Sequence, residues 1–99
     1  MFLNDYINDI KKLCIKHKVK HLYVFGSVLN NKFSAESDID LLVEINSSDP
    51  IDYAENYFSL KFELEELLNR SIDLLEDRAL KNPYLKKNID NSKTLIYAA

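Results

Sequence analysis

Residues 21–43 read HLYVFGSVLNNKFSAESDIDLLV, and they hold the most informative pattern in the chain. The apolar runs at its two ends are typical of β-strands. Gly26, which is the chain's only glycine, and Ser27 follow the first run, and ten residues separate Ser27 from Asp38. Because side chains alternate along a strand, Asp38 and Asp40 are expected on the same face of the second strand.

The two aspartates predict a metal site. Neighbouring carboxylates repel each other unless a cation lies between them, and Mg²⁺ is commonly held by one or two carboxylates together with substrate phosphates. Gly26-Ser27 follows a strand and could open a helix, where free backbone N–H groups favour a phosphate. A plainer interpretation stays open, in which the acids are solvated and Gly-Ser is an ordinary turn. The combination favours metal-dependent chemistry on a nucleotide.

A third acid, Asp73, lies in the apolar run of residues 72–75, where a charge needs a reason. One interpretation places it on an edge strand, facing water. The other places it beside the first two aspartates, where it shares their metal and acts as the general base for an attacking hydroxyl. Glu76 and Asp77 are weaker candidates because they fall where this strand should end.

The remaining pattern predicts an α/β (α+β) domain with one sheet, because strand-like segments alternate with helical ones. The order of the strands does not follow from the sequence. The expected elements are helices at residues 2–17, 27–33 and 84–90, a long helix that Asp49 caps and Pro50 begins, and strands at residues 20–25, 39–45, 71–76 and 94–97.

Composition limits the classes of function. The 99 residues, of which 46% are hydrophobic and 29% charged, predict one globular domain over residues 1–99. A net charge of −3 and a pI of about 5.3 argue against a protein that grips nucleic acid. Cys14, the one cysteine, is expected to be a buried thiol of a reduced, cytoplasmic protein. We see neither a membrane-spanning run nor a signal peptide.

Other polar residues are expected to be structural. His17 falls on the apolar stripe of the first helix and His21 begins a strand. No His–Cys or His–carboxylate spacing indicates a zinc site. Glu63, Glu65 and Glu66 are expected to form a solvated helix face.

The Gly-Ser-x10-Asp-x-Asp pattern resembles the signature of the DNA polymerase β-type nucleotidyltransferase superfamily. The length and the later segments are similar to its minimal nucleotidyltransferase (MNT) branch, and the likeness covers nearly the whole chain. The residues that carry it are Phe25-Gly26-Ser27, Asp38-Ile39-Asp40-Leu41-Leu42-Val43, Ile72-Asp73-Leu74 and Arg78-Ala79-Leu80-Lys81-Asn82-Pro83-Tyr84.

The resemblance implies a single-domain fold with a mixed sheet flanked by helices. It implies transfer of a nucleoside monophosphate, with pyrophosphate leaving. In the family, the residues matching Asp38 and Asp40 bind Mg²⁺, and the one matching Asp73 completes the catalytic triad that would hold two ions. The residues matching Gly26 and Ser27 hold the phosphates of the nucleotide.

Many MNT proteins are antitoxins encoded beside a HEPN-domain ribonuclease toxin, which they neutralise by adding AMP from ATP to a tyrosine. The resemblance therefore implies a HEPN partner. Many relatives carry an arginine just after Gly-Ser, where this chain has Val28-Leu29, and Lys32 is the nearest base that could serve the triphosphate. Since the nucleotide site uses most of the chain, the acceptor is expected to arrive on another macromolecule, and a protein fits the acidic charge better than a nucleic acid.

Three other functions stay open. The chain could be a catalytically idle antitoxin that inhibits its partner by contact alone. It could modify a small molecule such as an aminoglycoside, although such relatives usually carry an added helical domain. It could also be a structural or regulatory subunit with an incidental acidic pair. The apolar helix faces and the short last strand would permit a homodimer, and no membrane contact is expected.

Overall fold

The computed structural model describes residues 1–29, 33–34 and 36–99. The chain forms three α-helices, three short 3₁₀ helices and four strands in these parts. In chain order they are η1 (Phe2–Tyr6), α1 (Ile7–Lys16), β1 (Val19–Phe25), η2 (Gly26–Leu29), β2 (Ile39–Ile45), α2 (Pro50–Leu68), β3 (Ile72–Glu76), η3 (Asp77–Ala79), α3 (Pro83–Ser92) and β4 (Thr94–Ala98).

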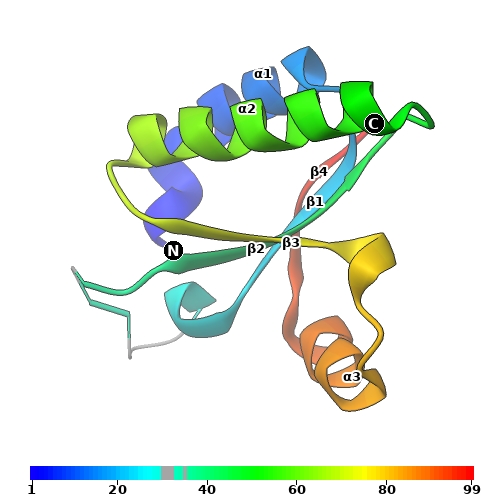
Figure 1. Ribbon diagram of the computed structural model, residues 1–99. Helices are drawn as coiled ribbons and strands as arrows, with labels where there is room; N and C mark the ends of the chain where they lie inside the picture. The colour runs from blue at the N-terminus through cyan, green and yellow to red at the C-terminus, as the bar shows by residue number, and fades with distance from the viewer. Residues whose placement is uncertain (30–32, 35) are drawn as a thin grey trace.

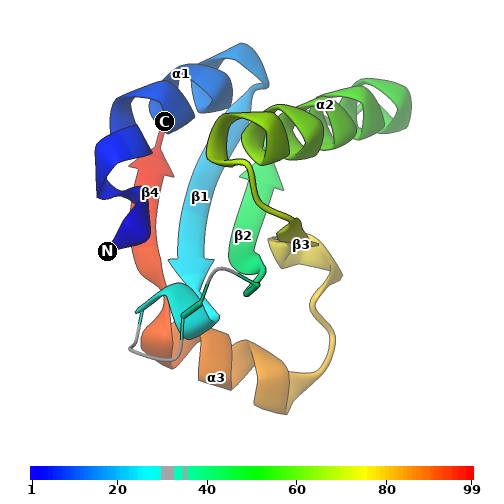
Figure 2. The ribbon, with the colours of Figure 1, turned by 90° about the vertical axis from the view of Figure 1, so that its left-hand side faces the viewer.

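The four strands make one mixed sheet in the order β3-β2-β1-β4. β1 pairs antiparallel with both β2 and β4, whereas β2 and β3 are parallel. Figure 2 shows β4, β1 and β2 side by side. The predicted α+β class with a mixed sheet is therefore confirmed, and β2, which carries Asp40, lies inside the sheet.

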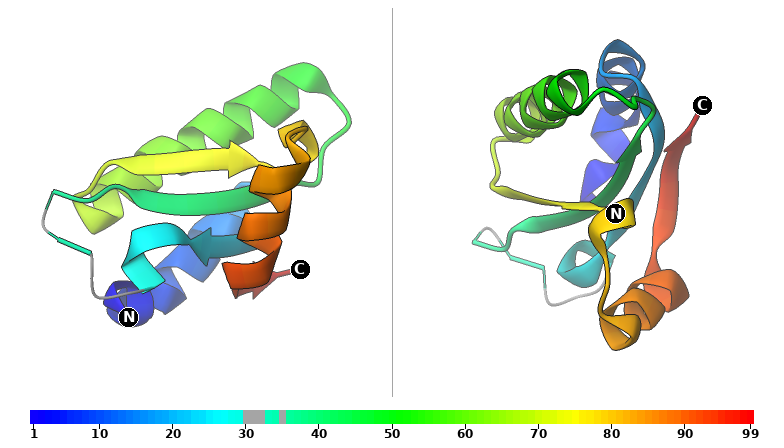
Figure 3. Two further views of the ribbon diagram at one scale, coloured as in Figure 1. Left: turned by 90° about the horizontal axis from the view of Figure 1, so that it is seen from below. Right: turned by 45° about the vertical axis from the view of Figure 1, so that its right-hand side comes forward.

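The two faces of the sheet differ. Figure 1 shows α1 and α2 together on one side and α3 on the other. Ile39, Leu41, Val43 and Ile45 of β2 are buried in the main core beneath α1 and α2. Alternation then turns Asp40 and Glu44 toward the opposite side, as the sequence predicts. Seen from that side, α3 crosses part of the strands (Figure 3), and we call this the open face.

Local signals explain the limits of α2. The Asp49 side chain accepts a hydrogen bond from the Ile51 N–H at 3.0 Å, and Pro50 occupies the first turn, so the predicted cap is confirmed. The helix ends where Asn69 adopts a left-handed conformation with φ of 52°. No helix in the described part of the chain combines the length and the apolar character needed to cross a membrane.

Side chains of α2 also close the outer edge of β3. The Tyr57 hydroxyl donates a hydrogen bond to the Leu74 carbonyl. The Ile72 N–H donates to Glu65 Oε2 at 3.1 Å. These contacts satisfy backbone groups that an edge strand leaves without a neighbouring strand.

Expectations for the helix types and for the acidic run of α2 need correction. The expected helix over residues 2–17 begins as the 3₁₀ helix η1, and the expected helix after Gly-Ser is a 3₁₀ turn over Gly26–Leu29 in its described part. The acidic run of α2 is not simply solvated, because Glu65 binds β3 and Glu63 pairs with Lys16 and the buried His17 of α1. Contacts from distant segments, which periodicity does not report, account for the second difference.

Candidate active site

The site is built on neighbouring positions of three strands. Asp40 of β2 lies opposite Phe25 of β1 and, on its other side, opposite Asp73 of β3. Parallel strands in register place Asp40 and Asp73 on the same face. Asp38 immediately precedes β2. The structure therefore brings the three predicted aspartates to one end of the open face, although β3 is an edge strand and Asp73 is exposed.

The surroundings of Asp40 act on its charge. Burial raises its pKa above the usual aspartate value, and the negative charges of Asp73 and Asp38 raise it further. Asp40 is half-buried, while the other two side chains are exposed. A carboxylate with a raised pKa beside two like charges gains from a cation, which would relieve both the repulsion and the desolvation.

Gly26 provides the space that Asp40 occupies. Its φ is +79°, in the left-handed region that favours glycine, and a Cβ at this position would lie 2.2 Å from Asp40 Oδ2. The turn backbone therefore passes directly against the carboxylate. Ser27 is half-buried in η2, the 3₁₀ turn that begins here. Lys32 lies outside the described residues.

Arg70 holds the segment that precedes Asp38, a role that the sequence did not predict. Its guanidinium donates hydrogen bonds to the carbonyls of Ser34 at 2.9 Å and Ser37 at 3.1 Å. It also stacks over Phe2 and Phe33, with 4.8 and 4.4 Å from the guanidinium carbon to the ring centroids. Arg70 thus positions the segment that leads into β2.

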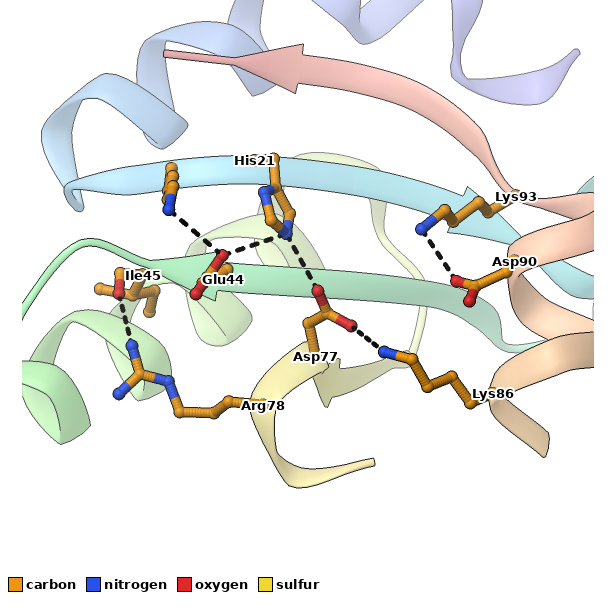
Figure 4. A network of polar contacts seen from close by, with 9 residues as sticks. His21, Glu44, Ile45, Asp77, Arg78, Lys86, Asp90 and Lys93 are labelled. Atoms are coloured by element: carbon orange, nitrogen blue, oxygen red, sulfur yellow. Dashed lines mark hydrogen bonds and ion pairs between the residues drawn. The ribbon is translucent and has the colours of Figure 1, made fainter. Parts of the chain in front are cut away.

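A second polar cluster lies on the open face, nearer the other ends of β2 and β3. His21, Glu44 and Asp77 each offer one ligand atom, and these atoms all lie within 4.8 Å of one another (Figure 4). Among the described residues, these three form the compact group of candidate metal ligands, rather than the three aspartates. Sequence spacing does not indicate this group, because the pairing of β1 with β2 and the position of Asp77 directly after β3 bring the three residues together.

The family follows from the sequence as a whole. The family model described as "Polymerase beta, Nucleotidyltransferase" matches residues 8–99, which is most of the chain. The chain belongs to the polymerase β nucleotidyltransferase family. The resemblance inferred from the Gly-Ser and aspartate motifs is thereby confirmed, and the mixed sheet with flanking helices is the fold of this family.

Relatives of this nucleotidyltransferase are similar over nearly their full length. A protein of Methanocaldococcus jannaschii, provisionally named protein adenylyltransferase MJ0128, is 40% identical over 96 residues, covering 96% of this chain and 93% of the relative. A solved structure described provisionally as a minimal nucleotidyltransferase is 28% identical, with a TM-score of 0.77, covering 93% of this chain and 90% of that one.

A third similarity concerns the fold. It is to a chain in a complex described as a tri-AMPylated Shewanella oneidensis HEPN toxin with an MNT antitoxin. The two chains are 23% identical, with a TM-score of 0.65, and the match covers 94% of this nucleotidyltransferase and 70% of that chain. At this identity the match shows a shared architecture.

The three aspartates suit a hard divalent cation. Carboxylate oxygens are the ligands that Mg²⁺ prefers, and Mg²⁺ usually keeps sites for water and substrate phosphates. The exposure of Asp38 and Asp73 leaves room for such partners, and the close approach of Gly26 to Asp40 brings backbone beside the same position. The residues present therefore fit a magnesium-assisted nucleotide site.

Proposed function

We propose that this nucleotidyltransferase transfers AMP from ATP to a hydroxyl of a partner protein and thereby acts as an antitoxin. The observation that carries the proposal is the convergence of Asp38, Asp40 and Asp73 beside Gly26 on the open face. The 40% identity to a chain named as a protein adenylyltransferase supports AMP as the transferred group. The architecture shared with a chain from an MNT–HEPN complex supports a HEPN-domain toxin as the acceptor. Tyrosine as the modified residue is what the family resemblance implies.

The residues of the candidate site have different roles in the proposed transfer. Asp38 and Asp40 would hold Mg²⁺, with Asp73 completing the set, and Gly26 and Ser27 would present backbone N–H groups to the phosphates. When bound, Mg²⁺ neutralises charge on the phosphates and on the departing pyrophosphate. The acceptor oxygen forms a bond to the α-phosphorus while the bond to the bridging oxygen of pyrophosphate breaks. Asp73 takes the hydroxyl proton, and its exposure leaves it accessible to a protein side chain.

The test is the intact mass of the HEPN-domain protein encoded alongside, after co-expression with this chain. The wild-type chain should add one or more AMP units, and Asp40→Asn should abolish the gain because a neutral amide is a poor ligand for a hard cation. Asp9→Asn is the matched control, since Asp9 is exposed on α1, which lies on the other side of the sheet from the aspartates.

The outcomes separate the alternatives. A mass gain with wild type and Asp9→Asn, but not with Asp40→Asn, supports protein adenylylation. A stable complex with no mass gain from any variant would refute transfer to this partner and favour inhibition by contact. No gain and no complex would refute the assigned acceptor and direct the search to small molecules.

A further inference from the structure

The His21–Glu44–Asp77 cluster joins three elements that are far apart in the sequence. His21 of β1 pairs with Glu44 of β2 across the antiparallel ladder, and Asp77 follows β3 directly. His21 Nε2 lies 3.5 Å from Glu44 Oε2 and 3.3 Å from Asp77 Oδ2. All three side chains are largely buried, with 20–25% of their surface exposed. The catalytic proposal uses none of them.

Two of the distances within the cluster match the ligand spacing of a tetrahedral metal site. Zinc bonds to histidine nitrogen and carboxylate oxygen of about 2.0–2.2 Å imply ligand–ligand edges of roughly 3.3–3.6 Å in a tetrahedron. The two distances from His21 Nε2 match these edges. The Glu44 and Asp77 oxygens lie within 4.8 Å of each other. A ligand set of one imidazole nitrogen and two carboxylate oxygens also suits Zn²⁺ and similar first-row metal ions better than Mg²⁺.

Two lysines lie beside the cluster, and neither is close enough to hydrogen-bond its carboxylates. Lys20 Nζ lies 3.9 Å from Glu44 Oε2, and Lys86 Nζ lies 3.8 Å from Asp77 Oδ1 (Figure 4). Both distances exceed a hydrogen bond, and the two lysine side chains are 61% and 49% exposed. Pairs of this kind contribute little and are readily exchanged. Lys86 also uses the Asp77 oxygen that the proposed ion does not need.

We propose that His21, Glu44 and Asp77 bind a divalent cation of the zinc class, with a fourth position left for water or another ligand. The bound ion links β1, β2 and the segment after β3. The site is separate from the aspartates and stands whether or not AMP transfer is observed.

Calorimetric titration of the full chain with zinc chloride tests the proposal. The Asp40→Asn background is used throughout, so that the aspartate site contributes less. We expect saturable binding of one ion per chain. His21→Gln and Asp77→Asn should each weaken it by about tenfold or more, because even indirect partners of a metal contribute 10- to 100-fold. Lys86→Met should tighten it, since a competing positive charge is removed.

Glu66→Gln is the matched control, because Glu66 is exposed on α2 and remote from the cluster, and it should leave the affinity unchanged. Circular dichroism checks that each variant folds, and having two ligand variants keeps the test open if one of them does not. Absence of saturable binding, or equal affinity in both ligand variants and the background protein, would overturn the proposal. An affinity lowered by Lys86→Met would do the same.

Discussion

Replacing Gly26 by alanine separates the role of the turn in function from its role in stability. A Cβ at position 26 would lie 2.2 Å from Asp40 Oδ2, and contacts below 3.0 Å essentially never occur. The carboxylate must therefore move by at least about 0.8 Å, judged from the usual contact distances of carbon and oxygen. Because the obstructing atom ends a side chain, Asp40 can rotate away, so this clash disturbs the site more than the fold.

The expected magnitudes differ for the two properties. Alanine at a φ of +79° costs roughly 1–2 kcal/mol of backbone free energy. A loss of this size lowers the melting temperature by roughly 4–16 °C for a domain of this length. A displacement near 1 Å at a reacting centre lowers the rate by about 100-fold. Gly26→Ala should therefore fold, melt earlier, and lose both its Mg²⁺-ATP response and nearly all transfer.

Thermal unfolding with and without Mg²⁺-ATP, together with the intact-mass assay, measures both effects. Asn69→Ala is the control, because Asn69 has a φ of 52° at the end of α2 and alanine there tests left-handed strain away from the aspartates. It should lower the melting temperature and retain ligand response and transfer. A Gly26→Ala protein with wild-type Mg²⁺-ATP response and transfer would refute the argument that the position of the Asp40 carboxylate depends on the space at Gly26.

Three further perturbations follow from the same contacts. In metal-free protein, Asp40 should take up its proton at a higher pH than a free aspartate, and Asp73→Asn should lower the pKa of Asp40. Carbon NMR measures this pKa, and an unchanged value in Asp73→Asn would contradict the closeness of the two carboxylates. Burial raises the pKa of the Cys14 thiol to about 12, so a thiol reagent at mildly alkaline pH should modify it only as fast as the chain unfolds; prompt modification of folded protein would contradict this. Arg70→Met should lower the free energy of unfolding in denaturant by about 1.5–3 kcal/mol, and Arg70→Lys should not restore it; equal stability of all three proteins would count against the stacked arrangement.

Much of the fold follows from local patterns. The alternation along residues 39–45 identifies the strand and its buried face, and Asp49-Pro50 marks the start of α2. The same alternation places Asp38 and Asp40 on one face, whereas the pairing of β3 with β2 brings Asp73 beside them. Each inference from the sequence depends on spacing within one element and on the rule that buried charges need partners.

What the sequence does not reveal depends on contacts between elements. The order β3-β2-β1-β4 decides that His21 meets Glu44 and Asp77, and no local pattern encodes that order. Arg70 likewise reaches a segment more than thirty residues earlier. The 3₁₀ conformation of η1 and η2 reflects tight turns at element ends, where propensity discriminates poorly between helix types.

The hydrogen bonds from α2 to the outer edge of β3 affect how copies of this protein can associate. An uncovered strand edge is a template for pairing with another chain. At β3, Tyr57 and Glu65 already bond two of the groups that such a chain would use, the Leu74 carbonyl and the Ile72 N–H. A further strand at β3 would have to break these two contacts, whereas β4 forms the opposite edge of the sheet. The hydrogen bonds from α2 therefore disfavour pairing with another chain on the side that carries Asp73.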